Sequence, residues 1–521
     1  MSAEDRWLER LWTGEVIASL SVTAALIAAE TAAILLWNDG TFLYTLDDPY
    51  IHFALAENIV DGHYGVNSGE PSAPSSSILW PVFLAPLVPT LGSFAALLLN
   101  VPAALVTAGV LGHVASFLRA DDAHASAPTV VLAIVLVIAT NTVGLVFTGM
   151  EHSLQVLLSV LTALGLYRTV HDDAPAPWWL WGVIVVAPLI RYENAALSVP
   201  ALAVLAVPER RRAGLAGILL AGLLGGYSLF LHDLGLSLLP TSVLAKTSLS
   251  GAWWSLLPQR LFRMVLNPRG LLLSLCFVGF AGFLLADRRS GPRRYAAWGA
   301  TMIGLHALFG RFGWFYRYEV YVWAAALVAL LLLYHDSIES FVRRAGTTAS
   351  VSVLVMLGMV TGAHYTKALL DTPQASHEIY LQQYQMHRFL TEHYRAPVAV
   401  NDLGWTSYRN DHYVLDLTGL ANLRSLRLRR NGATEWRRNA VRPYADSVQA
   451  ALLYANPGRR DLPPEWTPVA ALKFEWTPVA VAHNSVFFYA MDPSAATDLR
   501  RALRAFRPTL PPDATLQLLR D

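Results

Sequence analysis

Long apolar runs dominate the first 370 residues and predict membrane-spanning helices. A helix needs about 20 mainly apolar residues to cross the hydrocarbon core of a bilayer. Eleven such runs, two of them short, lie near residues 15–37, 93–118, 128–147, 153–170, 178–190, 194–207, 213–235, 270–286, 295–310, 319–335 and 347–369. We therefore expect residues 1–370 to form a polytopic α-helical membrane domain with about eleven transmembrane helices.

The apolar segment 76–91 is an exception, because it is short and contains Pro81, Pro86 and Pro89. Lys and Arg collect in the cytoplasmic loops of membrane proteins, so the loop charges decide whether this segment crosses. If it does not cross, the loops on the N-terminal side of the membrane hold 13 basic residues and the opposite loops before residue 367 hold 7. We therefore expect a cytoplasmic N-terminus and a first external loop, residues 38–92, that contains re-entrant or juxtamembrane helices.

The pattern changes after residue 370, and eleven crossings would place this part of the chain outside. Of the 39 basic residues, 18 lie in the last 151 positions. The segments 397–405, 412–420 and 485–492 are rich in β-branched and aromatic residues and predict strands, whereas 378–394 and 445–455 predict helices. Residues 371–521 are therefore expected to form an extracytoplasmic soluble domain of the α/β or α+β class.

The composition supports a membrane protein and excludes several other classes. The chain is 54% hydrophobic and 15% charged, against about 25% charged residues in a soluble domain. Its net charge of +1 gives no electrostatic reason to expect nucleic acid as a partner. The single cysteine, Cys276, excludes an internal disulfide and a Cys-based zinc site. No His, Asp and Glu cluster has the spacing of a metal site, and the chain has no Gly-rich phosphate loop.

The first external loop, which lacks Lys and Arg between residues 38 and 92, carries the first candidates for chemistry. Asp47 and Asp48 lie a few residues past the first apolar run, and repulsion between adjacent carboxylates favours a raised pKa for one of them. The alternative is that Asp48 caps a helix that begins at Pro49. Capping by Asp48 would not exclude catalysis by Asp47.

The helix that follows these aspartates is predicted to lie in the membrane interface. Its residues Ile51, Leu55 and Ile59 fall on one face, while His52 and Asn58 fall elsewhere. This amphipathic pattern is typical of a helix parallel to the membrane surface.

Charged residues also interrupt or end several apolar runs on the same external side. They are Glu151, Arg191, Glu193, Lys246 and Arg317. Charges at a membrane boundary are costly unless they are paired or functional, so their convergence on one side indicates a cavity there. The alternative is ordinary anchoring at the interface, which Arg, Trp and Tyr commonly provide. Anchoring explains Lys246 less well, because the chain has only three lysines.

Residues 46–81 resemble the first external loop of the GT-C superfamily of integral-membrane glycosyltransferases. Within it, they are most similar to the branch with the terminal arabinofuranosyltransferases of mycobacterial cell walls. Further similar pieces follow in the same order, at 149–151, 191–193, 238–247, 314–318 and 401–422. The loop departs from the family pattern at Pro49 and at 72–75, so the resemblance identifies neither the sugar nor the acceptor.

The resemblance implies a transferase that moves a sugar from a polyprenyl-phosphate carrier to an acceptor hydroxyl, outside the bacterial cytoplasmic membrane. Asp47 is the preferred general base and Asp48 the alternative, because this paired position matches the family. Lys246, Arg191 and Arg317 are the preferred partners of the donor phosphate. Four residues are candidates for holding the acceptor or orienting the base: His52, Asn67, Glu151 and Glu193.

Two other classes of function remain open. A transporter or flippase of a lipid-linked cell-envelope precursor would also have many spans and intramembrane charges, although such folds often show inverted repeats and midplane charges. We find no repeat between the two halves, and the polar groups collect at one surface. A non-catalytic protein whose outer domain binds glycan would not need either aspartate. The implied partners are the bilayer, the lipid-linked donor and a glycan, lipid or protein acceptor, and the need for a divalent metal stays open.

Overall fold

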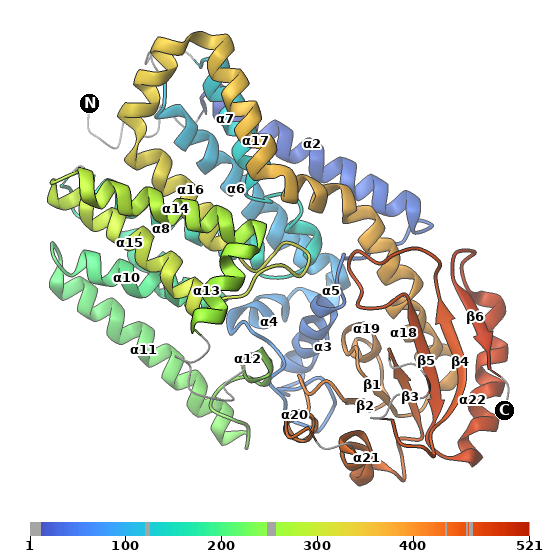
Figure 1. Cartoon of the computed structure of the whole chain (residues 1–521). Helices are drawn as coiled ribbons and strands as arrows, with labels where there is room; N and C mark the ends of the chain where they lie inside the picture. Colours follow the sequence, from blue (N-terminus) through green and yellow to red (C-terminus); the bar gives the residue numbers. More distant parts are fainter. Residues whose placement is uncertain are drawn as a thin grey trace. The chain divides into compact units, whose positions relative to one another are not determined.

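A computed structural model describes residues 12–119, 125–171, 173–246, 257–432, 435–454, 457 and 462–519 (Figure 1). The chain divides into two compact units, each built from three separate stretches. Unit 1 comprises residues 1–32, 97–225 and 249–371, and unit 2 comprises residues 33–96, 226–248 and 372–521. This partition assigns all of residues 38–92, together with residues 226–248, to the same unit as the C-terminal domain. The sequence-based boundary at residue 370 had grouped both with the membrane domain.

Unit 1 is helical, and four of its helices continue into unit 2. The helices that lie in unit 1 or cross its boundary are α2 (Gly14–Trp37), α6 (Ala95–Ser116), α7 (Ala127–Ala139), η3 (Val146–Thr148), α8 (His152–His171), α9 (Trp178–Ile190), η4 (Tyr192–Asn194), α10 (Ala195–Leu205), α11 (Arg210–Asp233), α13 (Leu257–Leu266), α14 (Pro268–Ala286), α15 (Ser290–Phe309), α16 (Val320–Leu333) and α17 (His335–Leu381). Gly346, with φ of 76°, interrupts the helical backbone of α17.

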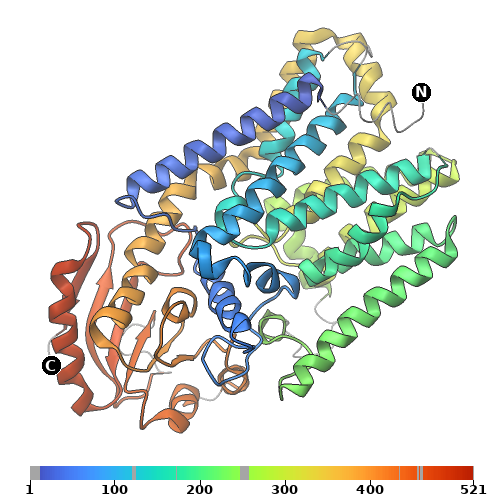
Figure 2. The ribbon, with the colours of Figure 1, turned by 180° about the vertical axis from the view of Figure 1, so that it is seen from behind.

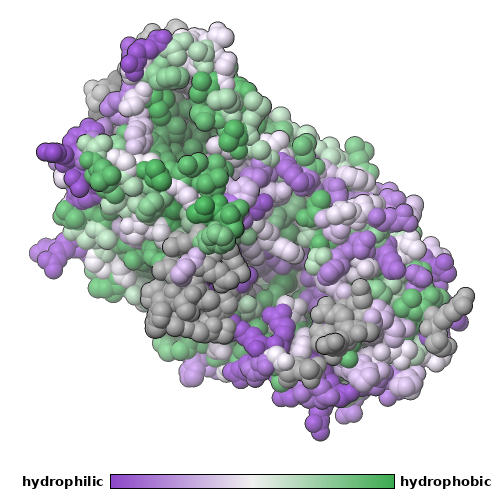
Figure 3. All heavy atoms as spheres, in the orientation of Figure 1, coloured by the Kyte–Doolittle hydropathy of each residue, from purple (hydrophilic) through white to green (hydrophobic). Residues whose placement is uncertain are grey.

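Each of the eleven apolar runs predicted from the sequence contains a helix, although in the run 128–147 the helix ends at Ala139. In the part of the chain that the structure describes, six helical segments are long and apolar enough to cross a membrane: 14–37, 88–116, 152–171, 210–233, 268–286 and 335–394. Figure 3 shows apolar residues gathered over the helices of unit 1 and polar residues over much of the C-terminal domain. The number of crossings, about eleven, stays a prediction.

Several helix starts follow local sequence signals. Ser126 forms a reciprocal capping box with Thr129 at the start of α7. Asn267 and Asn422 accept a hydrogen bond from a backbone N–H in the first turns of α14 and of α20 (Leu423–Arg430), respectively. These side chains satisfy amide groups that have no partner within the helix.

Unit 2 contains a mixed six-stranded sheet and a set of short helices (Figure 2). The strands are β1 (Val398–Val400), β2 (Val414–Asp416), β3 (Ala450–Leu453), β4 (Thr467–Lys473), β5 (Ser485–Ala490) and β6 (Thr515–Leu518). The helices are α3 (Asp48–Val60), α4 (Leu79–Leu84), α5 (Val88–Leu91), η2 (Gly92–Phe94), α12 (Thr241–Lys246), α18 (Gln383–Arg388), η6 (Phe389–Tyr394), α19 (Gly404–Ser407), α20 (Leu423–Arg430), α21 (Trp436–Val441), η7 (Arg442–Tyr444), α22 (Pro493–Phe506) and η8 (Arg507–Thr509).

The sheet has the strand order β2-β1-β3-β5-β4-β6. Strand β1 pairs in parallel with both β2 and β3, and the remaining pairs are antiparallel. The three parallel strands therefore end at one edge, at Val400, Asp416 and Leu453, which we call the carboxyl edge. In open α/β sheets this edge is where ligands commonly bind.

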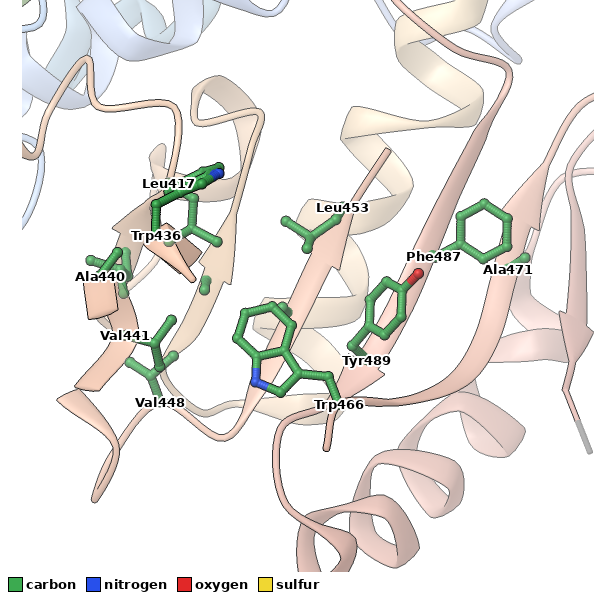
Figure 4. Close-up of a cluster of buried hydrophobic side chains, with 13 residues drawn as sticks. Leu417, Trp436, Ala440, Val441, Val448, Leu453, Trp466, Ala471, Phe487 and Tyr489 are labelled. Carbon is green, nitrogen blue, oxygen red and sulfur yellow. The ribbon is translucent and has the colours of Figure 1, made fainter. Parts of the chain in front are cut away.

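Both faces of the sheet are covered. Side chains alternate along each strand, so neighbouring residues of one strand pack on opposite faces. Phe487 and Tyr489 of β5 join Trp436 and Trp466 in a buried apolar cluster on one face (Figure 4). Phe488 points the other way and meets Phe389 of η6 at a ring distance of 5.2 Å. The sheet is therefore the core of unit 2.

The sequence predicts strands in the segments that contain β1, β2 and β5, and the structure confirms them. The predicted helix over 445–455 is wrong, because this segment holds strand β3. Its Ala and Leu residues favour a helix in isolation. Here they are buried in the middle of the sheet, between β1 and β5, where tertiary packing overrides that preference.

Candidate functional site

The carboxylate of Asp47 binds the start of helix α19 in the C-terminal domain. The N–H of Gly404 donates to Oδ2 at 2.6 Å, and the N–H of Trp405 donates to Oδ1 at 2.8 Å. A Cβ atom on Gly404 would collide with Asp47, so only glycine permits this approach. Asp47 therefore joins the segment 38–92 to the C-terminal domain within unit 2.

Helix α3 begins one residue earlier than the sequence suggests. It starts at Asp48, and Asp47 occupies the cap position without a side-chain bond to α3. The predicted start at Pro49 is therefore one residue late, and the side chain of Asp47 caps α19 instead of α3.

The packing of α3 also differs from the interfacial helix that its sequence pattern predicts. Ile51 and Leu55 are buried inside unit 2. The ring of Tyr50 stacks on Trp405 at 4.1 Å, which ties α3 to α19. Pattern alone does not distinguish a face that meets lipid from one that meets another part of the same protein, and here protein covers it.

Asp402 brings a third carboxylate to this region. It follows β1 at the carboxyl edge, and its Oδ2 accepts hydrogen bonds from the Tyr454 hydroxyl and from Gln383 Nε2, the latter at 2.8 Å. Tyr454 follows β3 at the same edge, and its backbone N–H donates to Asn401 Oδ1 at 2.8 Å. The parallel pairing of β1 and β3 thus places these side chains together.

The three aspartates interact electrostatically. Burial raises the pKa of Asp47 well above its ordinary value, and the neighbouring charges of Asp402 and Asp48 add to this, against the two backbone N–H donors. Burial also raises the pKa of Asp402, and the charge of Asp48 contributes, while Tyr454 and Gln383 act in the opposite direction. Burial therefore favours the protonated forms of Asp47 and Asp402, and perturbed carboxyl groups are common at sites of acid–base chemistry.

Asp48 is the more accessible member of the pair. It occupies the first position of α3 and is half-buried, whereas the side chain of Asp47 is 8% exposed. Both oxygens of Asp47 accept backbone bonds. By exposure, Asp48 is therefore better placed than Asp47 to meet a bound molecule.

The other two candidates between residues 38 and 92 are a buried histidine and an asparagine that binds the backbone. His52 is buried in α3, with 3% of its surface exposed. The amide of Asn67 pairs with Val414 of β2, donating to its carbonyl at 3.0 Å and accepting from its N–H at 2.9 Å. Asn67 therefore holds the loop against the edge strand of the sheet.

Unit 1 brings four further candidates into one buried cluster. Arg191 lies between α9 and α10 and donates to Glu151 at 2.5 Å and to Glu193 at 3.1 Å. Arg191 and Glu151 are almost fully buried. Arg317 is also buried and donates to the hydroxyl of Tyr318 at 3.3 Å. Both guanidinium groups lie over the Tyr318 ring, at 5.6 Å for Arg191 and 5.1 Å for Arg317.

The ion pairs of Arg191 make it less suited to bind a phosphate. Two carboxylates compensate the charge of Arg191, so a phosphate at this position would face Glu151 and Glu193 as well. Lys246 is the last residue of α12 in unit 2, and its side chain lies outside the described part of the structure.

Several polar residues at the carboxyl edge are not among the candidates that the sequence indicates. Asp402, Tyr454 and Gln383 lie 19 to 71 positions apart along the chain and meet only through the sheet. Asp416, which ends β2, accepts from the N–H groups of Thr418, Leu420 and Ala421. A usable signal was present, because each aspartate lies inside a segment predicted as a strand, where a carboxylate is unusual.

No group of three or more His, Cys, Asp or Glu side chains arranged for a metal ion occurs among the described residues. A family profile described as "Domain of unknown function (DUF8728)" matches residues 377–489, which run from the end of α17 to β5 and include Asp402, Asp416 and Tyr454. No curated protein matches the chain.

Proposed function

We propose that this protein is a membrane glycosyltransferase that moves a sugar from a polyprenyl-phosphate donor to an acceptor hydroxyl. The observation that carries the proposal is the half-buried carboxylate of Asp48, which interacts electrostatically with Asp47 and Asp402. These aspartates come from the loop after the apolar helix α2 and from the carboxyl edge of the sheet. The resemblance of residues 46–81 to the GT-C loop also singles out Asp47 and Asp48.

The chemical step needs a base and a group that accepts negative charge. The acceptor oxygen forms a bond to the anomeric carbon of the sugar while the bond from that carbon to the phosphate oxygen breaks. The electron pair leaves with the lipid phosphate, and the acceptor's proton passes to the carboxylate of Asp48. A cation beside the departing phosphate lowers the barrier.

The two aspartates take different roles in this proposal. Asp48 acts as the base because it is the more exposed carboxylate. Asp47 is a positioning residue, because both of its oxygens hold the start of α19. This reverses the preference that the sequence alone gave to Asp47.

Lys246 is the proposed partner of the donor phosphate. It belongs to unit 2, as do the three aspartates. Arg191 and Arg317 of unit 1 stay candidates on the resemblance, and the two carboxylates on Arg191 make it the weaker of the two. We further propose that the protein resides in the cytoplasmic membrane of a bacterium, with its N-terminus inside and the C-terminal domain outside.

Reconstituted transfer tests the proposal. The full chain in proteoliposomes is supplied with radiolabelled farnesyl-phosphate sugars of the arabinofuranose, mannose, glucose and galactose series and with methyl glycoside acceptors. We expect radiolabel in the acceptor and release of farnesyl phosphate with at least one donor. Asp48→Asn should lower turnover by a factor on the order of 10² or more. Asp61→Asn removes an exposed carboxylate at the other end of α3 and should leave turnover unchanged.

The possible outcomes separate the classes of function. Equal transfer by wild type and Asp48→Asn would overturn the proposed base. Movement of the labelled lipid between leaflets without any transfer would instead support a flippase.

A further inference from the structure

A second location in unit 2 has the features of a ligand site. A cavity of about 210 Å³ lies between three segments of the chain: residues 70–73, residues 235–241 and residues 421–424 together with Tyr444. We propose that this cavity binds one neutral sugar ring. The proposal rests on the proposed function only in that it identifies this ring as part of a glycan acceptor.

The fold builds the walls of this cavity from fixed segments. Asp416 holds the turn 418–421 through three backbone N–H groups, at 2.7, 2.5 and 2.8 Å. Gly419 in this turn has φ of +85°, and a Cβ atom there would collide with Leu426. Across the cavity, both the N–H and the hydroxyl of Thr241 donate to the carbonyl of Ala73 at 3.0 Å. The cavity is therefore formed before a ligand arrives.

Three polar side chains are joined by hydrogen bonds at the cavity wall. Asn422 Nδ2 donates to Glu70 Oε1 at 3.3 Å and to the Tyr444 hydroxyl at 3.2 Å. The Tyr413 hydroxyl donates to Glu70 Oε2 at 2.5 Å, and its ring stacks on Tyr444 at 5.3 Å. The second lone pairs of the Glu70 oxygens and of the Tyr444 oxygen remain able to accept hydrogen bonds from a ligand.

The chemistry of the lining selects a neutral polyhydroxylated molecule. Glu70 and Arg424 contribute one charge of each sign, so the lining has no net charge that would attract an anion or a cation. Carboxylate and amide groups bind hydroxyls through strong directional hydrogen bonds. Apolar surface from Pro71, Leu236 and Leu239 faces the same space and suits the C–H groups of a sugar ring.

The size of the cavity limits the ligand. Pockets for drug-sized molecules usually measure about 300–1,000 Å³, and this cavity is smaller. It therefore fits one ring, and the rest of a longer glycan would lie outside it.

Ligand-observed NMR on the full chain in nanodiscs tests the proposal. The probes are the methyl glycosides of glucose, galactose, mannose and arabinofuranose, and inorganic phosphate serves as the anionic probe. We expect saturation transfer to at least one glycoside. Glu70→Gln keeps the size of the side chain but removes its charge, and should weaken this binding about tenfold or more. Ser237→Trp fills the cavity from the 235–241 segment and should abolish binding without altering the Glu70 network.

The matched control is Glu465→Gln, which removes a surface carboxylate of the same unit that pairs with Arg438. It should bind the glycoside as wild type does. Glycoside binding that survives Ser237→Trp, or phosphate that displaces the glycoside, would overturn the proposal. Asp48→Asn separates the two inferences: it should abolish transfer and keep glycoside binding. Transfer by wild type without any effect of Ser237→Trp on binding or on transfer would refute the cavity alone.

Discussion

The backbone N–H of Gly404 donates to Oδ2 of Asp47, although the two residues are 357 positions apart in the chain. This bond joins the loop after α2 to the sheet domain, so both belong to one folded unit. A residue that the sequence marks as catalytic is thus also part of the fold.

Gly404→Ala should destabilise unit 2. The added Cβ would collide with Asp47, and overpacking of this kind costs about 1–3 kcal/mol. Thermal unfolding of the purified full chain measures the effect. Gly226→Ala is the control, because a Cβ there meets nothing within 4 Å and the position is helical. An equal unfolding temperature for both variants would contradict the close approach of Gly404 to Asp47.

The stability of unit 2 should increase on mild acidification. Burial raises the pKa of both Asp47 and Asp402, whereas an unfolded aspartate has a pKa of about 3.9. At pH values between the unfolded pKa and the folded pKa values, the folded state binds more protons than the unfolded state. The stabilisation that these two carboxyl groups contribute is therefore fully present below about pH 4 and is lost as the pH rises through the folded pKa values.

The measurement compares unfolding temperatures of wild type and Asp402→Asn between pH 8 and pH 5. Asparagine does not titrate, so the difference between wild type and variant should shift in favour of wild type as the pH falls. A difference that is flat with pH, or that shifts the other way, would show that these carboxyls are ionised in the folded protein.

The sequence predicted the helices well because each apolar run is a local signal. It also found β1, β2 and β5, whose Val, Leu, Phe and Tyr residues are typical of strands. It missed β4 and β6, and it predicted a helix where β3 lies, since Ala450 and Leu452 favour strand only through their neighbours in the sheet. Local composition thus predicts the helices and strands that follow from the preferences of their own residues. It does not predict a strand that depends on its neighbours in the sheet.

The candidate site shows the same difference between contacts that are local in sequence and contacts between distant residues. Asp47 and Asp48 are adjacent and were found as a pair, and the Arg191–Glu193 pair lies within three positions. The contact of Asp402 with Tyr454 depends on strand order, and that of Asp47 with Gly404 depends on the packing of α3 against α19. No short pattern encodes either. The bonding of Asn67 to Val414 likewise depends on an edge strand from a distant part of the chain.

Glu151→Gln should strongly destabilise unit 1. Glu151 and Arg191 are both buried, and removing one partner of such a pair costs about 3–5 kcal/mol because the other charge loses compensation. Glu193→Gln is the matched control: its carboxylate is 29% exposed and lies farther from Arg191, so we expect a loss of about 1 kcal/mol or less. Thermal unfolding in detergent compares the two. A larger loss for Glu193→Gln would contradict the arrangement.

Cysteine labelling tests the orientation in the membrane. In a Cys276→Ala background, cysteines at Ser68 and Arg427 should react with a membrane-impermeant thiol reagent in intact cells, because both positions are exposed in unit 2. A cysteine at Arg211, exposed at the start of α11, should react only after permeabilisation. The reverse pattern would invert the proposed topology.

The last prediction separates positioning from catalysis at the aspartate pair. Asp47→Asn keeps one carbonyl oxygen but replaces the other with an amide, which cannot accept from a backbone N–H. The variant should lose one of the two bonds to α19, with a destabilisation of about 1–3 kcal/mol. Below its lowered unfolding temperature it should retain part of its transfer activity.

Asp48→Asn should unfold close to the wild-type temperature and lose transfer by a factor on the order of 10². Unfolding curves and initial rates from the same preparations distinguish the two, and a catalytic loss in Asp47→Asn with unchanged stability would return the role of base to Asp47.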